Sequence, residues 1–227
     1  MALAGPKLPD WPSPNFGPRR HGALPDLVVI HYTAMPSCAE AEARLCDPEA
    51  EVSAHYLISA TGIVTALVPE ELRAWHAGAG QWGQCRDVNS RSIGIELDNP
   101  GTAPFPEAQM AALEALLADL LHRWQIPPER VIGHSDMAPA RKADPGPRFD
   151  WRRLARQGLS VWPETGCDPG DFVKDAKAFG FPDVAPDLLL AAFRLRFRPW
   201  ARGSLDATDA ALIADLAARF PVDRPHI

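Results

Sequence analysis

One stretch, residues 131–146 (VIGHSDMAPARKADPG), limits what this chain can fold into more than any other. It begins as a short apolar strand, breaks at Gly133, presents His134 and then loops through Lys142 and Asp144 to a Pro-Gly turn. Successive side chains of an extended segment point to opposite sides. Lys142 and Asp144, two positions apart, can therefore face one site together.

A second apolar run, residues 27–31 (LVVIH), also ends in a histidine. A continuous apolar run is typical of a strand buried on both faces. His31 then stands at the carboxyl end of that strand, where open α/β sheets place their ligand sites. Residues 92–97 predict another strand, with apolar side chains on one face and Glu96 on the other, beside the bare backbone of Gly94.

Other periodic segments predict helices and a hairpin around these strands. A capping box beginning at Ser37 opens a helix that reaches about Cys46. Residues 52–59 and 63–68 predict a β-hairpin, and residues 106–124 predict a long amphipathic helix. Strands and helices thus follow one another through this part of the chain.

After residue 163 the strand patterns end. Three short helical patterns follow, at residues 172–179, 186–197 and 208–220, separated by Gly and Pro. We therefore expect two units, residues 25–163 and a three-helix module over residues 164–227. The module is close to the lower size limit for independent folding.

The proline-rich residues 1–24 predict an extended arm that lies over the domain surface. They contain no apolar core of the length that a secretory signal requires. No stretch of the chain approaches the ~18 apolar residues of a membrane span, so we expect no integral membrane segment. The location is then cytoplasmic if Met1 is the native start, and periplasmic or at the outer membrane if a signal has been trimmed from the chain.

The net charge of the chain excludes a nucleic-acid partner, and the spacing of its cysteines excludes a C-x-x-C site. With 23 Lys and Arg against 29 Asp and Glu, the net charge is −6 and the pI is near 5.6. No Lys/Arg cluster offsets this charge, so nucleic acid is excluded as a partner. The four cysteines form no C-x-x-C pair. Cys38 and Cys46 lie about 12 Å apart along one predicted helix, too far for a disulfide, and we expect free thiols.

Two histidines and one carboxylate, His31, His134 and Asp144, form a set that zinc accepts. Three protein ligands leave the fourth position for water, which is typical of a catalytic site. Glu96 is the candidate acid and base, and Lys142 can stabilise negative charge on an attacked carbonyl oxygen. Structural alternatives remain open, because each histidine can be a hydrogen-bonded core residue and each charged group an ordinary ion-pair partner.

Five segments in this order, VVIHYTA, VSAHYLIS, AWHAG, RSIGIELDN and GHSDMAPARKADPGPRFDW, resemble the zinc-dependent N-acetylmuramoyl-L-alanine amidases of the phage-lysozyme and peptidoglycan-recognition fold. The resemblance runs from about residue 13 to residue 162. It implies an α/β fold with a mixed central β-sheet flanked by helices. The helical module resembles the peptidoglycan-binding-like extension of outer-membrane lipoprotein amidases, although the lipid-attachment cysteine of that branch is missing. The module can equally serve only to brace the amidase domain.

The resemblance also implies the roles of individual residues. Zinc would be held by His31, His134 and Asp144, with Glu96 as acid and base and Lys142 as the partner of the oxyanion. An aspartate as third ligand resembles the bacterial branch that processes anhydromuropeptides, since phage and animal relatives typically have cysteine there.

A Gly- and Gln-rich loop follows Trp75 and predicts a binding rim that includes Trp82. Trp75 and His76 are expected to contact the sugar or the peptide of a substrate. Core packing is the alternative for Trp75.

Three further residues are expected near the pocket. Asn89 and Arg141 would bind substrate carboxylates, for which the planar arginine fork is suited. His55 would support the metal ligands from behind, with plain core packing as the alternative.

We therefore expect a zinc enzyme that acts on peptidoglycan or on muropeptides during cell-wall turnover or recycling. It would hydrolyse the amide between N-acetylmuramic acid, or its 1,6-anhydro form, and L-alanine. A non-catalytic peptidoglycan-recognition protein is the alternative, although such relatives usually lack the metal ligands. A third possibility is a zinc peptidase that acts on D,D- or L,D-crosslinks.

Overall fold

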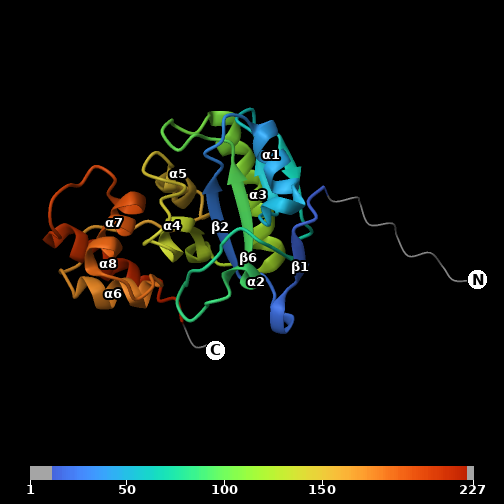
Figure 1. The fold of residues 1–227 in the computed structure, drawn as a ribbon. Helices are drawn as coiled ribbons and strands as arrows, with labels where there is room; N and C mark the ends of the chain where they lie inside the picture. The colour runs from blue at the N-terminus through green and yellow to red at the C-terminus, as the bar shows by residue number, and fades with distance from the viewer. Residues whose placement is uncertain (1–11, 224–227) are drawn as a thin grey trace, which may run out of the picture.

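The computed structural model describes residues 12–223, and a mixed five-stranded β-sheet lies at the centre of this part of the chain (Figure 1). The strand order is β4-β3-β6-β2-β7. The strands are β2 (Leu27–Tyr32), β3 (Tyr56–Ile58), β4 (Val64–Ala66), β6 (Ser92–Leu97) and β7 (Val131–Gly133). Neighbours pair in parallel except β3 and β4, which form the predicted hairpin. The expected α/β fold with a mixed sheet is confirmed.

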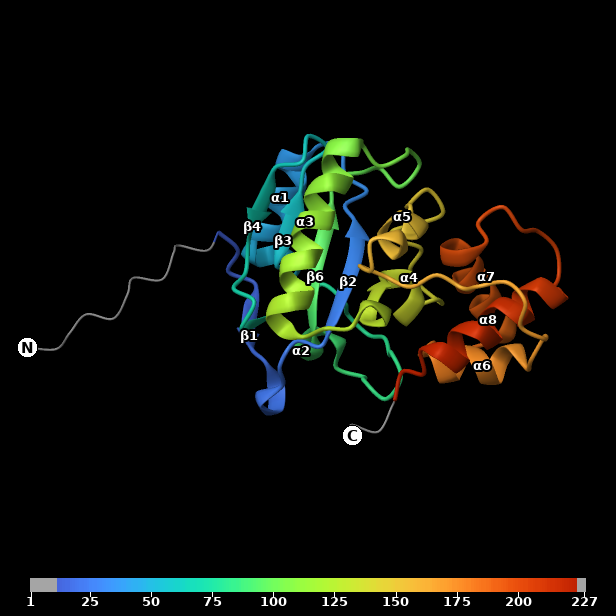
Figure 2. The same cartoon turned by 180° about the vertical axis from the view of Figure 1, so that it is seen from behind.

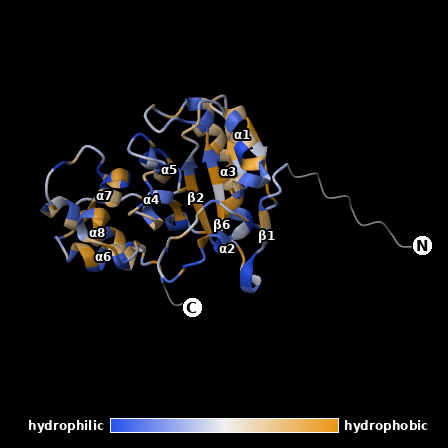
Figure 3. Ribbon diagram, in the orientation of Figure 1, coloured by the Kyte–Doolittle hydropathy of each residue, from blue (hydrophilic) through white to orange (hydrophobic). Residues whose placement is uncertain are grey.

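Hydrophobic burial explains why the central strands form. Residues 27–30 of β2 are completely buried, as a continuous apolar run between two covered faces requires. Figure 3 shows β2 and β6 as mostly hydrophobic ribbons inside a more polar exterior. Because side chains alternate, Val28 and Ile30 face one layer of the core while Leu27 and Val29 face the other.

Helix α3 (Glu107–Trp124) covers one face of the sheet (Figure 2). Its apolar positions Leu113, Leu117 and Leu120 pack in one cluster with Ile93 and other strand residues. The remaining helices before residue 163 are shorter: α1 (Cys38–Cys46), α2 (Val88–Arg91), α4 (His134–Met137), α5 (Trp151–Arg156) and the 3-10 turns η1 (Arg20–Gly22), η2 (Pro48–Ala50) and η3 (Pro128–Arg130). The serine half of the predicted capping box is present at the start of α1, where the Ser37 hydroxyl oxygen accepts the Glu40 amide at 3.2 Å. The Glu40 carboxylate accepts the Ser37 hydroxyl rather than completing the box.

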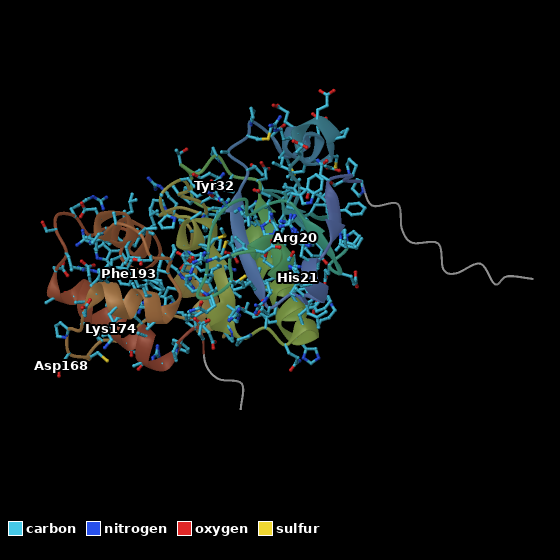
Figure 4. The ribbon with its side chains drawn as sticks, turned by 60° about the horizontal axis from the view of Figure 1, so that its bottom comes forward. Arg20, His21, Tyr32, Asp168, Lys174 and Phe193 are labelled. Atoms are coloured by element: carbon cyan, nitrogen blue, oxygen red, sulfur yellow. The ribbon has the colours of Figure 1, made fainter. Side chains whose placement is uncertain are left out.

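The C-terminal module consists of α6 (Phe172–Phe179), α7 (Pro186–Phe197) and α8 (Ala207–Arg219), close to the predicted ranges. Figure 4 shows Phe193 inside this group of helices, with Lys174 and Asp168 toward its outer side. The apolar side chains of the module belong to one cluster with the second face of the sheet, which includes Leu27 and Val29. The two parts of the chain thus share a hydrophobic core.

The structure corrects two expectations. The predicted binding rim does not include Trp82, which is 1% exposed and packs edge-on against Phe179 and Phe181. The sequence predicts a loop after Gly133, but the first turn of this segment is the helix α4, which His134 begins. An apolar indole in a loop can be core when another element covers it, and the C-terminal module covers Trp82.

Three other expectations concern the ends of the chain, its cysteines and membrane spans. Residues 1–11 of the predicted arm lie outside the described residues, and residues 16–18 form β1 (Phe16–Pro18), which pairs with β5 (Leu72–Ala74). All four cysteines are free, as predicted. Between residues 12 and 223, no helix has the length and apolar content to cross a bilayer.

Candidate metal centre

Three predicted metal ligands converge at the carboxyl ends of the parallel strands. The Nδ1 atoms of His31 and His134 lie 2.9 Å apart. Asp144 Oδ2 lies 2.9 Å from the first and 3.1 Å from the second. All three residues are buried, and their donor atoms form a group that can hold a metal ion.

The donor set fits zinc in both geometry and charge. A tetrahedral zinc with bonds of 2.0–2.1 Å separates its ligand atoms by about 3.3 Å, so a few tenths of an ångström of adjustment suffice. Burial, together with the neighbouring His134, lowers the pKa of His31 to about 4, which keeps this imidazole neutral. Burial raises the pKa of Asp144, but its close contacts with the two buried histidines outweigh this effect and hold that pKa below its usual range. Neutral imidazole and carboxylate are the forms that bind metal.

Backbone features bring the ligands together. His31 in β2 pairs in parallel register with Glu96 in β6, while β7 leads directly into His134. The backbone amide of Ser135 donates to the Asp144 carbonyl at 2.9 Å, which closes the loop that carries the carboxylate. A Cβ on Gly133 would lie 2.8 Å from Cδ of the proline that follows Asp144, so only glycine lets this loop approach the strand end.

Glu96 lines the same cavity as His31, His134 and Asp144. Burial and the nearby charge of Asp144 raise its pKa to about 8, against the opposing effect of Lys142. One of its carboxylate oxygens is buried without a hydrogen-bond partner among the described residues. A carboxyl group with a pKa near neutrality can both accept and donate a proton at physiological pH.

A cavity of about 690 Å³ opens above these residues. Its lining includes His31, His134, Asp144, Glu96, Lys142, Trp75, His76 and Arg141. The exposed Lys142 therefore faces the same site as Asp144. Eight of the ten residues predicted for the site thus gather around one cavity.

Asn89 and His55 do not line this cavity. Asn89 is 7% exposed, and its side-chain oxygen accepts the backbone amides of His76 and Ala77 at 3.1 and 2.8 Å. His55 is fully buried behind His76, and its Nδ1 accepts the amide of Gly94 at 2.9 Å. Both side chains hold backbone that lies behind the site.

Arg141 lines the cavity, but its guanidinium N–H groups donate hydrogen bonds to backbone carbonyl oxygens of the protein. Its guanidinium donates to the carbonyl oxygens of Ala77 and Ala79. It therefore ties the loop after His134 to the loop that carries His76.

Tyr32 and Arg44 are among the lining residues that sequence reasoning missed. Tyr32 follows His31 at the end of β2, away from Arg20 and His21 in the turn that precedes the strand (Figure 4). Arg44 is an exposed residue of α1, and only the packing of α1 beside the strand ends brings it to the cavity. The position of Tyr32 beside a predicted ligand was a usable indication, whereas Arg44 offered none.

Comparisons with known proteins agree with this geometry. A family model described as N-acetylmuramoyl-L-alanine amidase matches residues 21–147. The chain is 36% identical to N-acetylmuramoyl-L-alanine amidase AmiD of Escherichia coli K12, over 87% of this chain and 84% of that protein. It is 35% identical to 1,6-anhydro-N-acetylmuramyl-L-alanine amidase AmpD of the same organism, over 63% of this chain and 87% of that protein. The solved complex of E. coli AmiD with anhydro-N-acetylmuramic acid-L-Ala-D-γ-Glu-L-Lys superposes with a TM-score of 0.80 at 35% identity, covering 91% of this chain and 92% of that one.

Proposed function

Because this chain belongs to the N-acetylmuramoyl-L-alanine amidase family, we propose that its cavity binds muropeptides and that its buried His-His-Asp group serves their hydrolysis. The bond cleaved is the amide between the lactyl carbonyl of N-acetylmuramic acid, or of its 1,6-anhydro form, and the nitrogen of L-alanine. The observation that carries the proposal is the convergence of His31, His134 and Asp144 beside Glu96 in one cavity.

We propose zinc as the metal, held by Nδ1 of His31, Nδ1 of His134 and Oδ2 of Asp144. When bound, zinc would polarise the lactyl carbonyl and lower the pKa of water toward neutrality. Two nitrogens and one carboxylate oxygen suit zinc, and three protein ligands are typical of its catalytic sites.

Glu96 is proposed as the group that moves the proton. It accepts a proton from the attacking water and returns it to the alanine nitrogen as the amide bond breaks. Its pKa of about 8 belongs to the site without a cation, and a nearby divalent charge lowers the pKa of a carboxyl group. The carboxylate form needed to accept the first proton is then available near pH 7.

Lys142 is proposed to stabilise the negative charge that develops on the lactyl oxygen as its carbon becomes tetrahedral. Trp75 is proposed to pack against the sugar or the peptide. Arg44, which lines the cavity from α1, is a candidate partner for carboxylates of the stem peptide, because guanidinium groups pair with carboxylates in a planar fork.

Mass spectrometry of muropeptides incubated with the zinc-loaded protein tests the proposal. The expected products are the free sugar and an intact stem peptide that begins with L-alanine. Binding without release of the stem peptide would contradict the amidase proposal and indicate a non-catalytic recognition protein. Cleavage within the crosslinks would indicate a peptidase. Parallel reactions with anhydro and reducing-end muropeptides, and with intact murein, identify the preferred form of the substrate.

A further inference from the structure

We propose that His76 is a positioning residue, which together with Ser92 fixes His31 in the tautomer that leaves Nδ1 free to bind the metal. The inference rests on the proposed function in that it assigns His31 as a ligand. It moves His76 from the predicted substrate contacts to a role behind the metal group.

Hydrogen bonds connect His31 to His76 and His76 to Ser92. Ser92, the residue farthest from the metal group, determines which atom donates in each of them. The Ser92 hydroxyl lies 2.6 Å from the backbone carbonyl oxygen of Val88, and a carbonyl oxygen can only accept. The single hydroxyl proton of Ser92 is therefore used in that bond. Its oxygen can then only accept from the other neighbour, Nε2 of His76, at 3.1 Å.

The proton on Nε2 of His76 in turn determines which nitrogen of His31 donates. With its proton on Nε2, a neutral His76 presents Nδ1 as an acceptor. Nε2 of His31 lies 3.0 Å from that atom, so His31 donates from Nε2. A neutral imidazole protonated on Nε2 has its lone pair on Nδ1, which is the atom that faces His134 and Asp144. The Asp144 carboxylate can only accept and therefore favours a proton on this Nδ1 when no cation is present, and the acceptor on His76 opposes that preference.

Two features hold His76 in place for this role. A Cβ on Gly94 would lie 2.4 Å from the His76 ring, so the bare backbone of β6 allows the ring to lie against the strand. The side-chain oxygen of Asn89 accepts the amide of His76 itself, which fixes the backbone from which the ring projects. The glycine at position 94 and the asparagine at position 89 thus both serve to hold His76 in place. Neither residue needs to contact a substrate for this role.

The second histidine ligand has an equivalent arrangement. Nε2 of His134 lies 2.9 Å from the carbonyl oxygen of Ala77, which can only accept, so His134 also keeps its proton on Nε2 and its lone pair on Nδ1. Asn89 accepts the amide of Ala77 as well. One buried amide side chain therefore holds the two adjacent residues that orient both histidines. Such outer hydrogen bonds typically change metal affinity by 10–100-fold when removed.

The arrangement also argues against a direct substrate contact by His76. Nδ1 faces His31 and Nε2 faces Ser92, so both ring nitrogens are engaged within the protein. A substrate can reach the carbon edge of this ring but no free nitrogen.

The direct test is NMR spectroscopy of the metal-free protein with ¹⁵N-labelled histidines, in which ¹H–¹⁵N correlations show which ring nitrogen carries the proton. We expect His31 and His76 both protonated on Nε2 only. In the Ser92→Ala protein we expect His76 to populate both tautomers. A proton on Nδ1 of His76 in the unaltered protein, or a single unchanged tautomer in Ser92→Ala, would overturn the inference.

A matched pair of variants tests the consequence for the metal. Asn and Leu have nearly the same shape, but Asn keeps an acceptor oxygen at the position of Nδ1. His76→Leu should weaken zinc binding by 10–100-fold in a chelator competition assay, and His76→Asn should stay within a few-fold of the unaltered protein. Equal losses in both variants, or no loss in either, would contradict the proposed role, because packing alone would then account for His76.

These readouts separate the inference from the proposed function. A protein with the expected tautomers and zinc affinities that releases no stem peptide would refute the amidase proposal and leave the role of His76 standing. Circular dichroism of the metal-free variants confirms that each one is folded before its zinc affinity is compared.

Discussion

Glu96 combines a charged side chain with a position between buried apolar strand residues, and its neighbours decide its chemistry. Burial and Asp144 raise its pKa, and Lys142 opposes them. The residue does not belong to the metal-binding group of His31, His134 and Asp144. Its loss should therefore affect proton transfer while the metal stays bound.

We predict that Glu96→Gln keeps its zinc and loses activity. The amide has nearly the same size as the carboxylate but cannot accept the proton, so kcat should fall by about 10²–10⁴-fold. Zinc content by atomic absorption and turnover by chromatography check the two halves of the prediction. Glu71→Gln, at an exposed position, is the matched control and should behave like the unaltered protein. Activity retained in Glu96→Gln would remove this residue from the proposed role.

His55 is a second residue whose environment has a measurable consequence. It is fully buried, and burial together with Arg19 lowers its pKa to about 3. In the unfolded chain a histidine has a pKa near 6.5. Because the folded pKa is the lower one, the contribution of His55 to stability is fully present above pH 6.5 and is lost as the pH falls toward 3.

We predict that His55→Asn makes stability less dependent on pH. Asn keeps an acceptor for the Gly94 amide and does not titrate. Between pH 7.5 and 4.5 the unaltered protein should lose on the order of 2–3 kcal/mol more unfolding free energy than the variant. Urea unfolding of the metal-free proteins at the two pH values measures this difference. Parallel losses in the two proteins would show that His55 is not the titrating group.

At the scale of elements, helix α7 reaches across to the metal centre through Arg196. This guanidinium is 2% exposed and donates to Asp136 Oδ2 at 2.6 Å, to the carbonyl of Val131 and to Ser160. Asp136 Oδ2 also accepts the amide of Gly133, at the junction from which His134 projects. The ring of Trp151 lies 4.2 Å from the guanidinium carbon. Arg196 therefore supports the strand end from which His134, a proposed metal ligand, projects.

We predict that Arg196→Met destabilises the protein by about 3–5 kcal/mol, because it leaves the buried Asp136 without its counter-charge. Equilibrium unfolding in urea measures this loss. The same change at the exposed Arg156 of α5 should cost less than ~0.5 kcal/mol. A loss below about 1 kcal/mol for Arg196→Met would mean that Asp136 is satisfied by other groups.

The elements differ in how far the sequence could predict them. Helices α6 and α7 are predictable at both ends because their apolar repeats are bounded by Asp171, Pro186 and Gly or Pro breaks. The proposed metal group is only partly predictable from local patterns: His31 follows a buried strand and His134 begins the turn after one, but spacing alone leaves a structural role open for each histidine. The full set with Asp144 is implied by the resemblance of the five segments to the amidase family. Helix α4 is one turn long and has no periodicity to detect. The hydrogen bonds from His31 through His76 to Ser92 depend on how a loop lies against β6, which local patterns do not encode.

At the scale of the whole molecule, residues 25–163 and 164–227, proposed as two units, share one hydrophobic core. Trp82 lies before the proposed boundary and packs against Phe179 and Phe181 beyond it. The sequence indicates where the strand patterns end, but it does not reveal which apolar residues the C-terminal helices cover. Local pattern therefore predicts a binding rim at Trp82, where the structure has a buried indole.

We predict that a chain ending at residue 163 folds less stably than the full chain. Removal of the module exposes Trp82 and leaves Asp136 without Arg196. We expect a melting temperature lower by several degrees and increased binding of a hydrophobic dye. Differential scanning calorimetry and dye fluorescence measure both. A truncated chain with an unchanged melting temperature would mean that the module is an independent unit attached to a complete domain.

The bond from Arg196 to the carbonyl of Val131 has a consequence for how the protein is made. Strand β7 is at one edge of the sheet, and Arg196 and Asp136 satisfy its outward-facing carbonyl at Val131 and amide at Gly133. An uncovered edge strand invites pairing with other chains. Arg196 lies in α7, which follows β7 in the chain, so each nascent copy carries an open sheet edge from the time β7 emerges until α7 has emerged. Slow translation between β7 and α7 would therefore favour aggregation of this protein.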